Sequence, residues 1–195
     1  TGGFNGSGGT VQFSTSTHNL NVGTSLTGSI QLLSGFLNIN SPLTAPAFLQ
    51  SGGTLQGTAT FTTSGLYTWT AGTMTAAGIT NVNGGLAMNG GTVDISGGRT
   101  LNNPATATMS SNAVVRIGSG AVVNNSGTWD CQNDTNLQNP FGGTAVFNNS
   151  GTFKKTVGTG VTTVFSTLTG FHNTGSVQAF IRIDIPQSCN SSLIQ

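Results

Sequence analysis

The sequence predicts an all-β fold in which the chain coils into a β-solenoid of about eight coils. The first reason is a repeat: residues 123–129, 147–153 and 171–177 align at a constant spacing of 24 residues, with apolar residues over apolar residues and turn residues over turn residues. The second is that no segment shows helical periodicity. The third is glycine, 30 of 195 residues, which suits a chain with many turns. A fixed period without helix formers is typical of β-architectures that stack coil on coil.

The expected strands are short stretches rich in Thr, Val, Ile and Phe that lie between Gly or Asn turns. Pairs such as Gly52-Gly53 and Asn83-Gly84 could close hairpins, but the 24-residue repeat favours the corners of a coil. Residues 37–50 contain Pro42 and Pro46, so we expect a loop insertion there. The strands are expected at residues 10–13, 29–32, 59–61, 66–70, 92–95, 113–117, 121–123, 144–147, 152–154 and 181–185.

Strand alternation assigns the side-chain directions within the repeats, because successive side chains point to opposite faces. Large apolar residues in register, one coil above the next, should fill the interior as a stack. Cys131 shares the inward direction in this register. The expected core stack consists of Trp129, Phe153, Val177, Val123, Phe147 and Phe171.

A row of identical amides is expected at one corner of the coils. Asn125, Asn149 and Asn173 occupy the same place in three successive repeats. Identical amides about 4.8 Å apart hydrogen-bond along a stack, as Asn ladders do in cross-β structures. We therefore expect a structural ladder here rather than a ligand site.

The composition excludes two classes of partner. Only 5% of the residues are charged, the net charge is +1, and no basic patch exists beyond Lys154-Lys155. The electrostatic footprint of a nucleic-acid-binding protein is therefore missing. No apolar run approaches the roughly 20 residues that a membrane helix needs, so we expect no membrane insertion.

Reactive side chains are few. The carboxylates are Asp94, Asp130, Asp134 and Asp184, and the histidines are too few and too far apart for a zinc site. Parallel β-helices also host polysaccharide lyases and hydrolases, which need clustered carboxylates, often with Ca²⁺ and a basic residue. Asp130 and Asp134 lie in one coil near Lys154 on the next. They form either a weak cation or acid–base site or a surface charge pair beside a polar loop. We expect no metal and no cofactor.

Tyr67 and Trp69 share one face of an expected strand. If they point outward, they offer a platform on which sugar rings stack. Comparison with Trp129, which follows a threonine in the same way, favours an inward direction. The sequence leaves both directions open.

The repeats resemble those of a known group of proteins. Residues 147–155, followed by 158–163 and 171–177, resemble repeats of large bacterial surface proteins, the filamentous-haemagglutinin-like and autotransporter-passenger-like β-solenoids, as do residues 66–74. The resemblance covers roughly residues 60–178. It implies a right-handed parallel β-helix exported to the cell surface, and it carries no catalytic residues. A right hand is also the usual hand of parallel β-crossovers.

The chain divides into solenoid coils over residues 1–178 and a capping strand with a polar tail over residues 179–195. The segment after Gln178 departs from the repeat, and its charges and Pro186 suit a cap over an edge that would otherwise template aggregation. It could equally be a point where a longer protein continues. End-to-end or edge self-association is therefore expected as one form of partnership.

These observations predict a non-catalytic, extracellular or cell-surface segment of an adhesin-like or structural protein that holds a long, weakly charged surface. Its expected partners are a polysaccharide or the surface of a host or neighbouring cell. One alternative is a carbohydrate-binding module that uses Tyr67 and Trp69. Another is a polysaccharide-active enzyme that uses Asp130.

Overall fold

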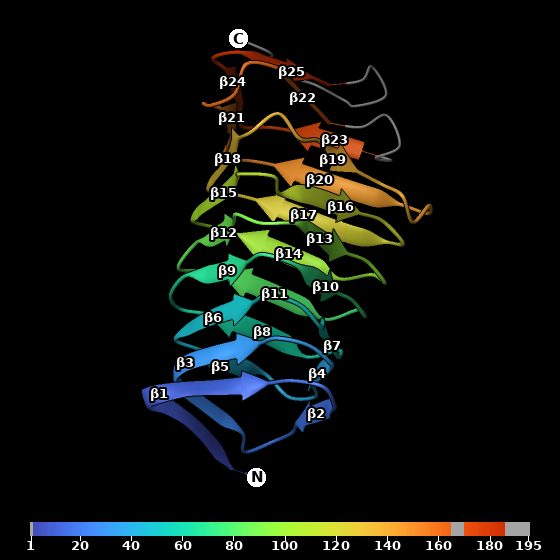
Figure 1. Ribbon diagram of the computed structural model, residues 1–195. Helices are drawn as coiled ribbons and strands as arrows, with labels where there is room; N and C mark the ends of the chain where they lie inside the picture. Colours follow the sequence, from blue (N-terminus) through green and yellow to red (C-terminus); the bar gives the residue numbers. More distant parts are fainter. Residues whose placement is uncertain (1, 165–169, 186–195) are drawn as a thin grey trace.

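The backbone winds as a three-sided solenoid of about eight turns. The computed structural model describes residues 2–164 and 170–185, and within them the chain forms strands and turns but no helix. This part of the chain accordingly offers no membrane-spanning helix. Figure 1 shows the strands stacked in one direction, from the blue N-terminal end to the red C-terminal end. Neighbouring strands pair in parallel in these residues. The predicted all-β solenoid is confirmed.

Three sheets form the walls. Sheet A consists of β1 (Gly3–Phe13), β3 (Ser25–Leu32), β6 (Ala47–Gln50), β9 (Tyr67–Trp69), β12 (Leu86–Met88), β15 (Thr106–Ser110), β18 (Thr128–Gln132), β21 (Thr152–Lys155) and β24 (Ser176–Ala179). Sheet B consists of β2 (Thr17–Leu20), β4 (Phe36–Ile39), β7 (Thr54–Gln56), β10 (Gly72–Met74), β13 (Thr92–Ile95), β16 (Val114–Ile117) and β19 (Leu137–Gln138). Sheet C consists of β5 (Leu43–Ala45), β8 (Thr60–Thr63), β11 (Ile79–Val82), β14 (Thr100–Asn103), β17 (Ala121–Asn125), β20 (Ala145–Asn149) and β23 (Gly170–Asn173). A further parallel pair joins β22 (Val161–Thr163) to β25 (Arg182–Asp184).

The number of residues per coil increases along the chain, and the 24-residue period holds only for the last coils. Stacked residues are 19 apart at Asn19 and Asn38, and 24 apart at Asn124 and Asn148. The added residues lie in the corners: residues 118–120 link β16 to β17, whereas residues 139–144 link β19 to β20. Because these residues are added outside the paired strands, the walls stay in register while the coil grows.

The loop insertion expected at residues 37–50 is wrong. This segment supplies β4, β5 and β6, one strand for each wall, and each pairs in register with the coil above. Pro42 directly precedes β5, and Pro46 lies between β5 and β6. Proline is tolerated at such corners because its missing N–H is not needed by a strand ladder.

The interior is one continuous apolar column. Trp129, Phe153 and Val177 overlie one another in sheet A. Val123, Phe147 and Phe171 do the same in sheet C. Phe147 stacks on Phe171 with ring centroids 5.4 Å apart and meets Trp129 edge to face at 5.1 Å. All six side chains are buried, so the core stack lies where the sequence placed it.

Glycine recurs at one corner because the coils approach each other closely there. A Cβ added at Gly151 would lie 2.0 Å from the carbonyl oxygen of Gly127, and one added at Gly175 would lie 2.0 Å from that of Gly151. Only glycine allows backbones to come this close. The glycine of the N-N-S-G pattern is therefore required by close backbone contact between successive coils.

Coiling continues past residue 178, where the sequence suggested a boundary. Strand β24 ends at Ala179 and still pairs with β21 in sheet A. Strand β25 then pairs in parallel with β22, as the next coil would. The tail predicted beyond it, residues 186–195, lies outside the described residues.

Candidate functional site

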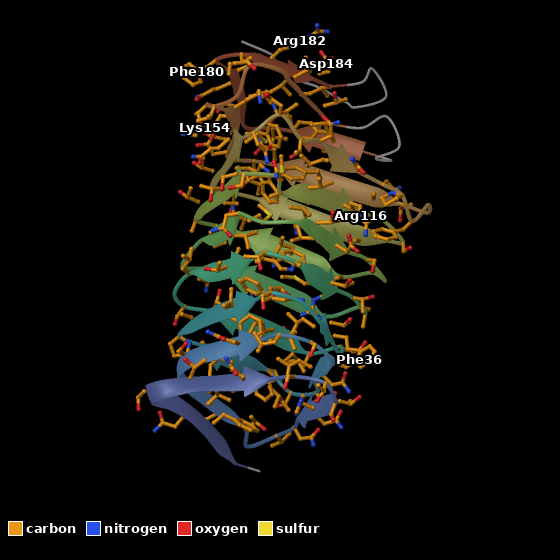
Figure 2. All side chains as sticks on the ribbon, in the orientation of Figure 1. Phe36, Arg116, Lys154, Phe180, Arg182 and Asp184 are labelled. Carbon is orange, nitrogen blue, oxygen red and sulfur yellow. The ribbon has the colours of Figure 1, made fainter. Side chains whose placement is uncertain are left out.

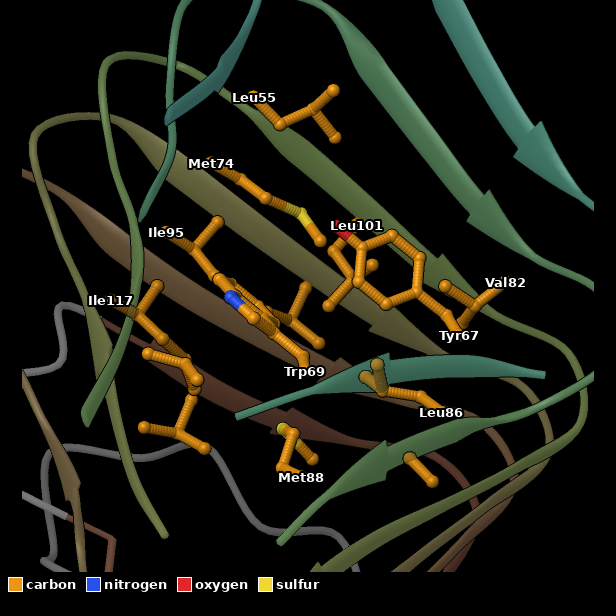
Figure 3. Close-up of a cluster of buried hydrophobic side chains, with 14 of the residues drawn as sticks. Leu55, Tyr67, Trp69, Met74, Val82, Leu86, Met88, Ile95, Leu101 and Ile117 are labelled. Atoms are coloured by element: carbon orange, nitrogen blue, oxygen red, sulfur yellow. The ribbon is translucent and has the colours of Figure 1, made fainter. Parts of the chain in front are cut away.

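Tyr67 and Trp69 face the interior, as the comparison with Trp129 favoured, and the alternative in which they form a sugar-stacking platform is wrong. Both side chains are fully buried, and Figure 3 shows them packed among apolar side chains from several coils. The Tyr67 hydroxyl donates a 2.5 Å hydrogen bond to Oε1 of Gln50. Burial raises the pKa of Tyr67 well above its usual value. Strand alternation predicts that the two aromatic residues share one face, and their burial shows that this face points into the solenoid.

Asp130 and Lys154 are neighbours on the outer surface of sheet A. Lys154 Nζ lies 3.8 Å from Asp130 Oδ2. The same carboxylate accepts a 2.7 Å hydrogen bond from the Thr156 hydroxyl and a 2.9 Å bond from the Gln132 amide. Both carboxylate oxygens are therefore already engaged by neighbouring side chains.

Asp134 belongs to a different set of partners. It accepts a 2.8 Å hydrogen bond from Lys155 Nζ and a 3.1 Å bond from the backbone N–H of Thr159. The hydrogen bond from Lys155 holds the pKa of Asp134 below its usual value, with help from the backbone N–H groups of Thr159 and Gly160. The structure thus gives Asp130 and Asp134 separate cationic partners instead of one shared site.

Lys155 is a fully buried cation that the sequence reasoning missed. Its ammonium group contacts the backbone carbonyl of Asn133 and the Thr162 hydroxyl in addition to Asp134. The signal was present in the sequence: because Phe153 points inward, residue 155 must point inward too. Within the described residues, no three His, Cys, Asp or Glu side chains gather as metal ligands.

Arg99 is a second buried cation that the sequence did not reveal. Its guanidinium donates to the Thr80 hydroxyl at 2.8 and 3.1 Å and to the Gly57 carbonyl at 3.1 Å. In the part of the chain that the structure describes, no carboxylate forms an ion pair with it. Burial lowers the pKa of Arg99 to about 10. The group is held by neutral oxygens inside the wall, so it acts as a structural bridge between coils.

Cys131 is a buried free thiol stacked between Met109 and Lys155. Burial raises its pKa to about 12 from the ordinary 9.0. The folded chain therefore keeps a proton that the unfolded chain loses as the pH passes 9, and stability falls as the pH rises from about 9 to about 12.

A thiol prediction follows, tested in a Cys189→Ser background so that a single cysteine remains. Between pH 8 and pH 10, the free energy of unfolding should fall by about 1 kcal/mol more in this protein than after a further Cys131→Ala change. Urea titrations at the two pH values measure this difference. Equal pH dependence in both proteins would mean that the thiol is not buried in the folded state.

The predicted asparagine ladder lies inside the wall and is longer than the sequence indicated. Asn103 donates to Asn125 at 2.7 Å, Asn125 to Asn149 at 2.7 Å, and Asn149 to Asn173 at 2.6 Å. Each of these three donors also bonds a backbone carbonyl of the coil above, that of Thr128, Thr152 or Ser176, at 3.0–3.1 Å. Asn103 escaped notice because it lies 22 residues before Asn125, not 24.

A second amide ladder runs along the outer face of sheet C. Asn102 donates to Asn81, Asn124 to Asn102, and Asn148 to Asn124, each at 2.8 Å. His172 stands over Asn148 in the next coil and is exposed. Outward polar side chains are thus bonded to their equivalents in the adjacent coil.

The surface divides into a charged half and an uncharged half. Every Asp, Lys and Arg lies between residues 94 and 184, so residues 1–93 carry no formal charge apart from any on His18 or the chain terminus. Several large apolar side chains are exposed on this half, among them Phe36 (47%) and Leu66 (48%). Leu66, Ala47 and Leu49 line a shallow hollow of about 190 Å³ on sheet A. The uncharged outer surface of the first coils is the candidate functional site.

Comparison of the chain with protein-family models, with curated proteins and with solved structures gives no match. Function must therefore be inferred from the geometry of the solenoid itself.

Proposed function

We propose that the chain is a non-catalytic β-solenoid segment of an adhesin-like or structural protein, displayed outside the cell as a rigid rod. The observation that carries the proposal is the register of sheet A, which continues over nine strands from β1 to β24. At about 4.8 Å per coil, this gives a rod close to 40 Å long. A rod of this kind suits a spacer that holds a surface at a fixed distance from its anchor.

The polar side chains support the same proposal. The inner ladder at Asn125 and Asn149 and the outer ladder at Asn102 and Asn124 join neighbouring coils in the middle and C-terminal part of the solenoid. Such bonds add to the interface between neighbouring coils, which is the cooperative unit of a repeat protein. Asp130 and Asp134, the carboxylates considered for catalysis, are each engaged with neighbouring donors.

Mechanical pulling tests the rod. Handles are attached through Gly3→Cys and Asp184→Cys in a background in which Cys131→Ala and Cys189→Ser remove the native thiols. A load-bearing rod holds its length until it yields in a few abrupt steps, each releasing one or more coils. Smooth extension from the lowest forces, as in an unfolded chain, contradicts the proposal.

The enzyme alternative has its own test. The protein is incubated with a panel of neutral and acidic polysaccharides, and new reducing or unsaturated ends are measured. We expect no release above that of an Asp130→Asn, Asp134→Asn double variant. Turnover that disappears in the double variant would replace the scaffold proposal with a polysaccharide-active enzyme.

Antibody labelling of intact cells that make the protein tests its surface display.

A further inference from the structure

We infer that the outer face of β2, β4 and β7 binds a neutral polysaccharide. This inference rests on the proposed function, because it supplies a ligand class for an adhesin-like rod. It also moves the sugar-binding surface away from Tyr67 and Trp69, which are buried. The surface has three components: an exposed aromatic ring, a row of bonded amides and an absence of charge.

The aromatic ring is Phe36, at the first position of β4. It is 47% exposed and projects from the outer side of the wall, as Figure 2 shows. In register, Thr17 lies on one side of it and Thr54 on the other, so small hydroxyl side chains flank the ring. An exposed aromatic ring on a flat sheet offers an apolar face to the C–H face of a sugar ring, with little side-chain entropy to lose.

The amide row lies two residues further along the same strands, on the same outer face. Asn38 Nδ2 donates to Asn19 Oδ1 at 2.7 Å, and Gln56 Nε2 donates to Asn38 Oδ1 at 2.7 Å. A primary amide has two N–H donors and two acceptor lone pairs. Asn38 therefore uses one donor and one lone pair in the row and retains one of each. Since the row fixes the orientation of the amides, little ordering is needed to bond sugar hydroxyls, which both donate and accept.

The charge distribution selects the kind of polysaccharide. No Lys or Arg occurs in residues 1–93, so an acidic glycan finds no counter-charge on this half of the rod. A neutral glycan needs none. Successive rows repeat at about 4.8 Å, and the Phe36 column lies about 7 Å from the amide column. This footprint suits a short stretch of an extended sugar chain laid along the wall.

Binding to insoluble polysaccharides tests the inference. The probes are microcrystalline cellulose, chitin and curdlan as neutral polymers, and a polygalacturonate gel as the acidic one. We expect the protein to bind at least one neutral polymer, and its Kd to rise about tenfold or more in Phe36→Ala and in Asn38→Leu. It should bind polygalacturonate more weakly than that neutral polymer.

Matched controls lie on sheet C. Ile79→Ala removes another exposed apolar side chain, and Asn102→Leu interrupts the outer ladder of that sheet. Both should leave the Kd within about twofold of the parent. All variants are first shown by circular dichroism and thermal melting to keep the fold.

Three outcomes overturn the inference: no binding to any neutral polymer, equal binding by the parent and Phe36→Ala, or preference for polygalacturonate. If no polymer binds and sedimentation shows a dimer that Phe36→Ala dissociates, the face instead joins two copies of the chain. A rod that resists pulling but binds nothing overturns this inference alone. A chain that extends smoothly under load overturns the proposed function even if it binds sugar.

Discussion

Replacing Phe147 with alanine should lower the free energy of unfolding of the C-terminal coils by about 3–5 kcal/mol. Phe147 is fully buried and touches three other rings, those of Trp129, Phe153 and Phe171, at centroid distances of 5.1–5.5 Å. Its removal leaves a cavity between two walls as well as losing the transfer energy of the ring. A loss of this size is a large part of the 5–15 kcal/mol that folded proteins usually have. Urea unfolding followed by circular dichroism measures it.

The control for Phe147 is its neighbour on the same strand. Val146 points outward and is only partly buried, so Val146→Ala should cost well under half as much. If the two substitutions cost the same, Phe147 does not lie at the centre of an apolar stack.

Replacing Asn149 with leucine should cost about 3 kcal/mol or more, although leucine is the more apolar residue. Asn149 accepts from Asn125 and donates to Asn173 and to the carbonyl of Ser176, all within the wall. Leucine would remove the donor to the Ser176 carbonyl and both side-chain hydrogen bonds of the ladder, and each buried bond lost costs about 1–3 kcal/mol. Urea titration gives the loss of stability.

The adjacent residue again supplies the control. Asn148 belongs to the outer ladder of sheet C, where water replaces a lost partner, so Asn148→Leu should change stability by less than about 1 kcal/mol. A loss for Asn149→Leu no larger than for Asn148→Leu would mean that the inner ladder is not buried in the folded protein.

The sequence predicted those features that repeat at equal spacing. A constant spacing of 24 residues is enough to predict that Trp129 lies over Phe153 and Asn125 over Asn149, because their coils have the same length. The first coils could not, because they are shorter by several corner residues and the side chains at the corners differ. The proline-containing segment was misread for a related reason: Pro42 and Pro46 look like breaks in a wall but lie at its corners.

The candidate site was harder to predict than the fold. Alternation gives the direction of a side chain, and it correctly favoured an inward Trp69, but it does not give the reach of a long one. The Lys155 side chain lies inside the wall and forms an ion pair with Asp134, whereas Lys154 lies outside and pairs with Asp130. Phe36 lies between the expected strand at residues 29–32 and the loop expected at residues 37–50, so alternation assigned it no direction. Its exposure depends on the register of β4 with β2 and β7.

The central claim is that coils of increasing length stack like residue over like. Cysteine pairs at outward positions test it most directly, because stacked residues lie about 4.8 Å apart and a disulfide needs Cα atoms within about 4.4–6.8 Å. In each of three variants, cysteine replaces both residues of one stacked pair, in a background without Cys131 and Cys189. The pairs are Asn19 and Asn38, Asn81 and Asn102, and Asn124 and Asn148. Mild oxidation should close all three within one chain, at separations of 19, 21 and 24 residues. A fourth variant, Asn19→Cys with Leu43→Cys, places the two cysteines 24 residues apart and should not close. Closure between positions 19 and 43, with none between 19 and 38, would contradict the account.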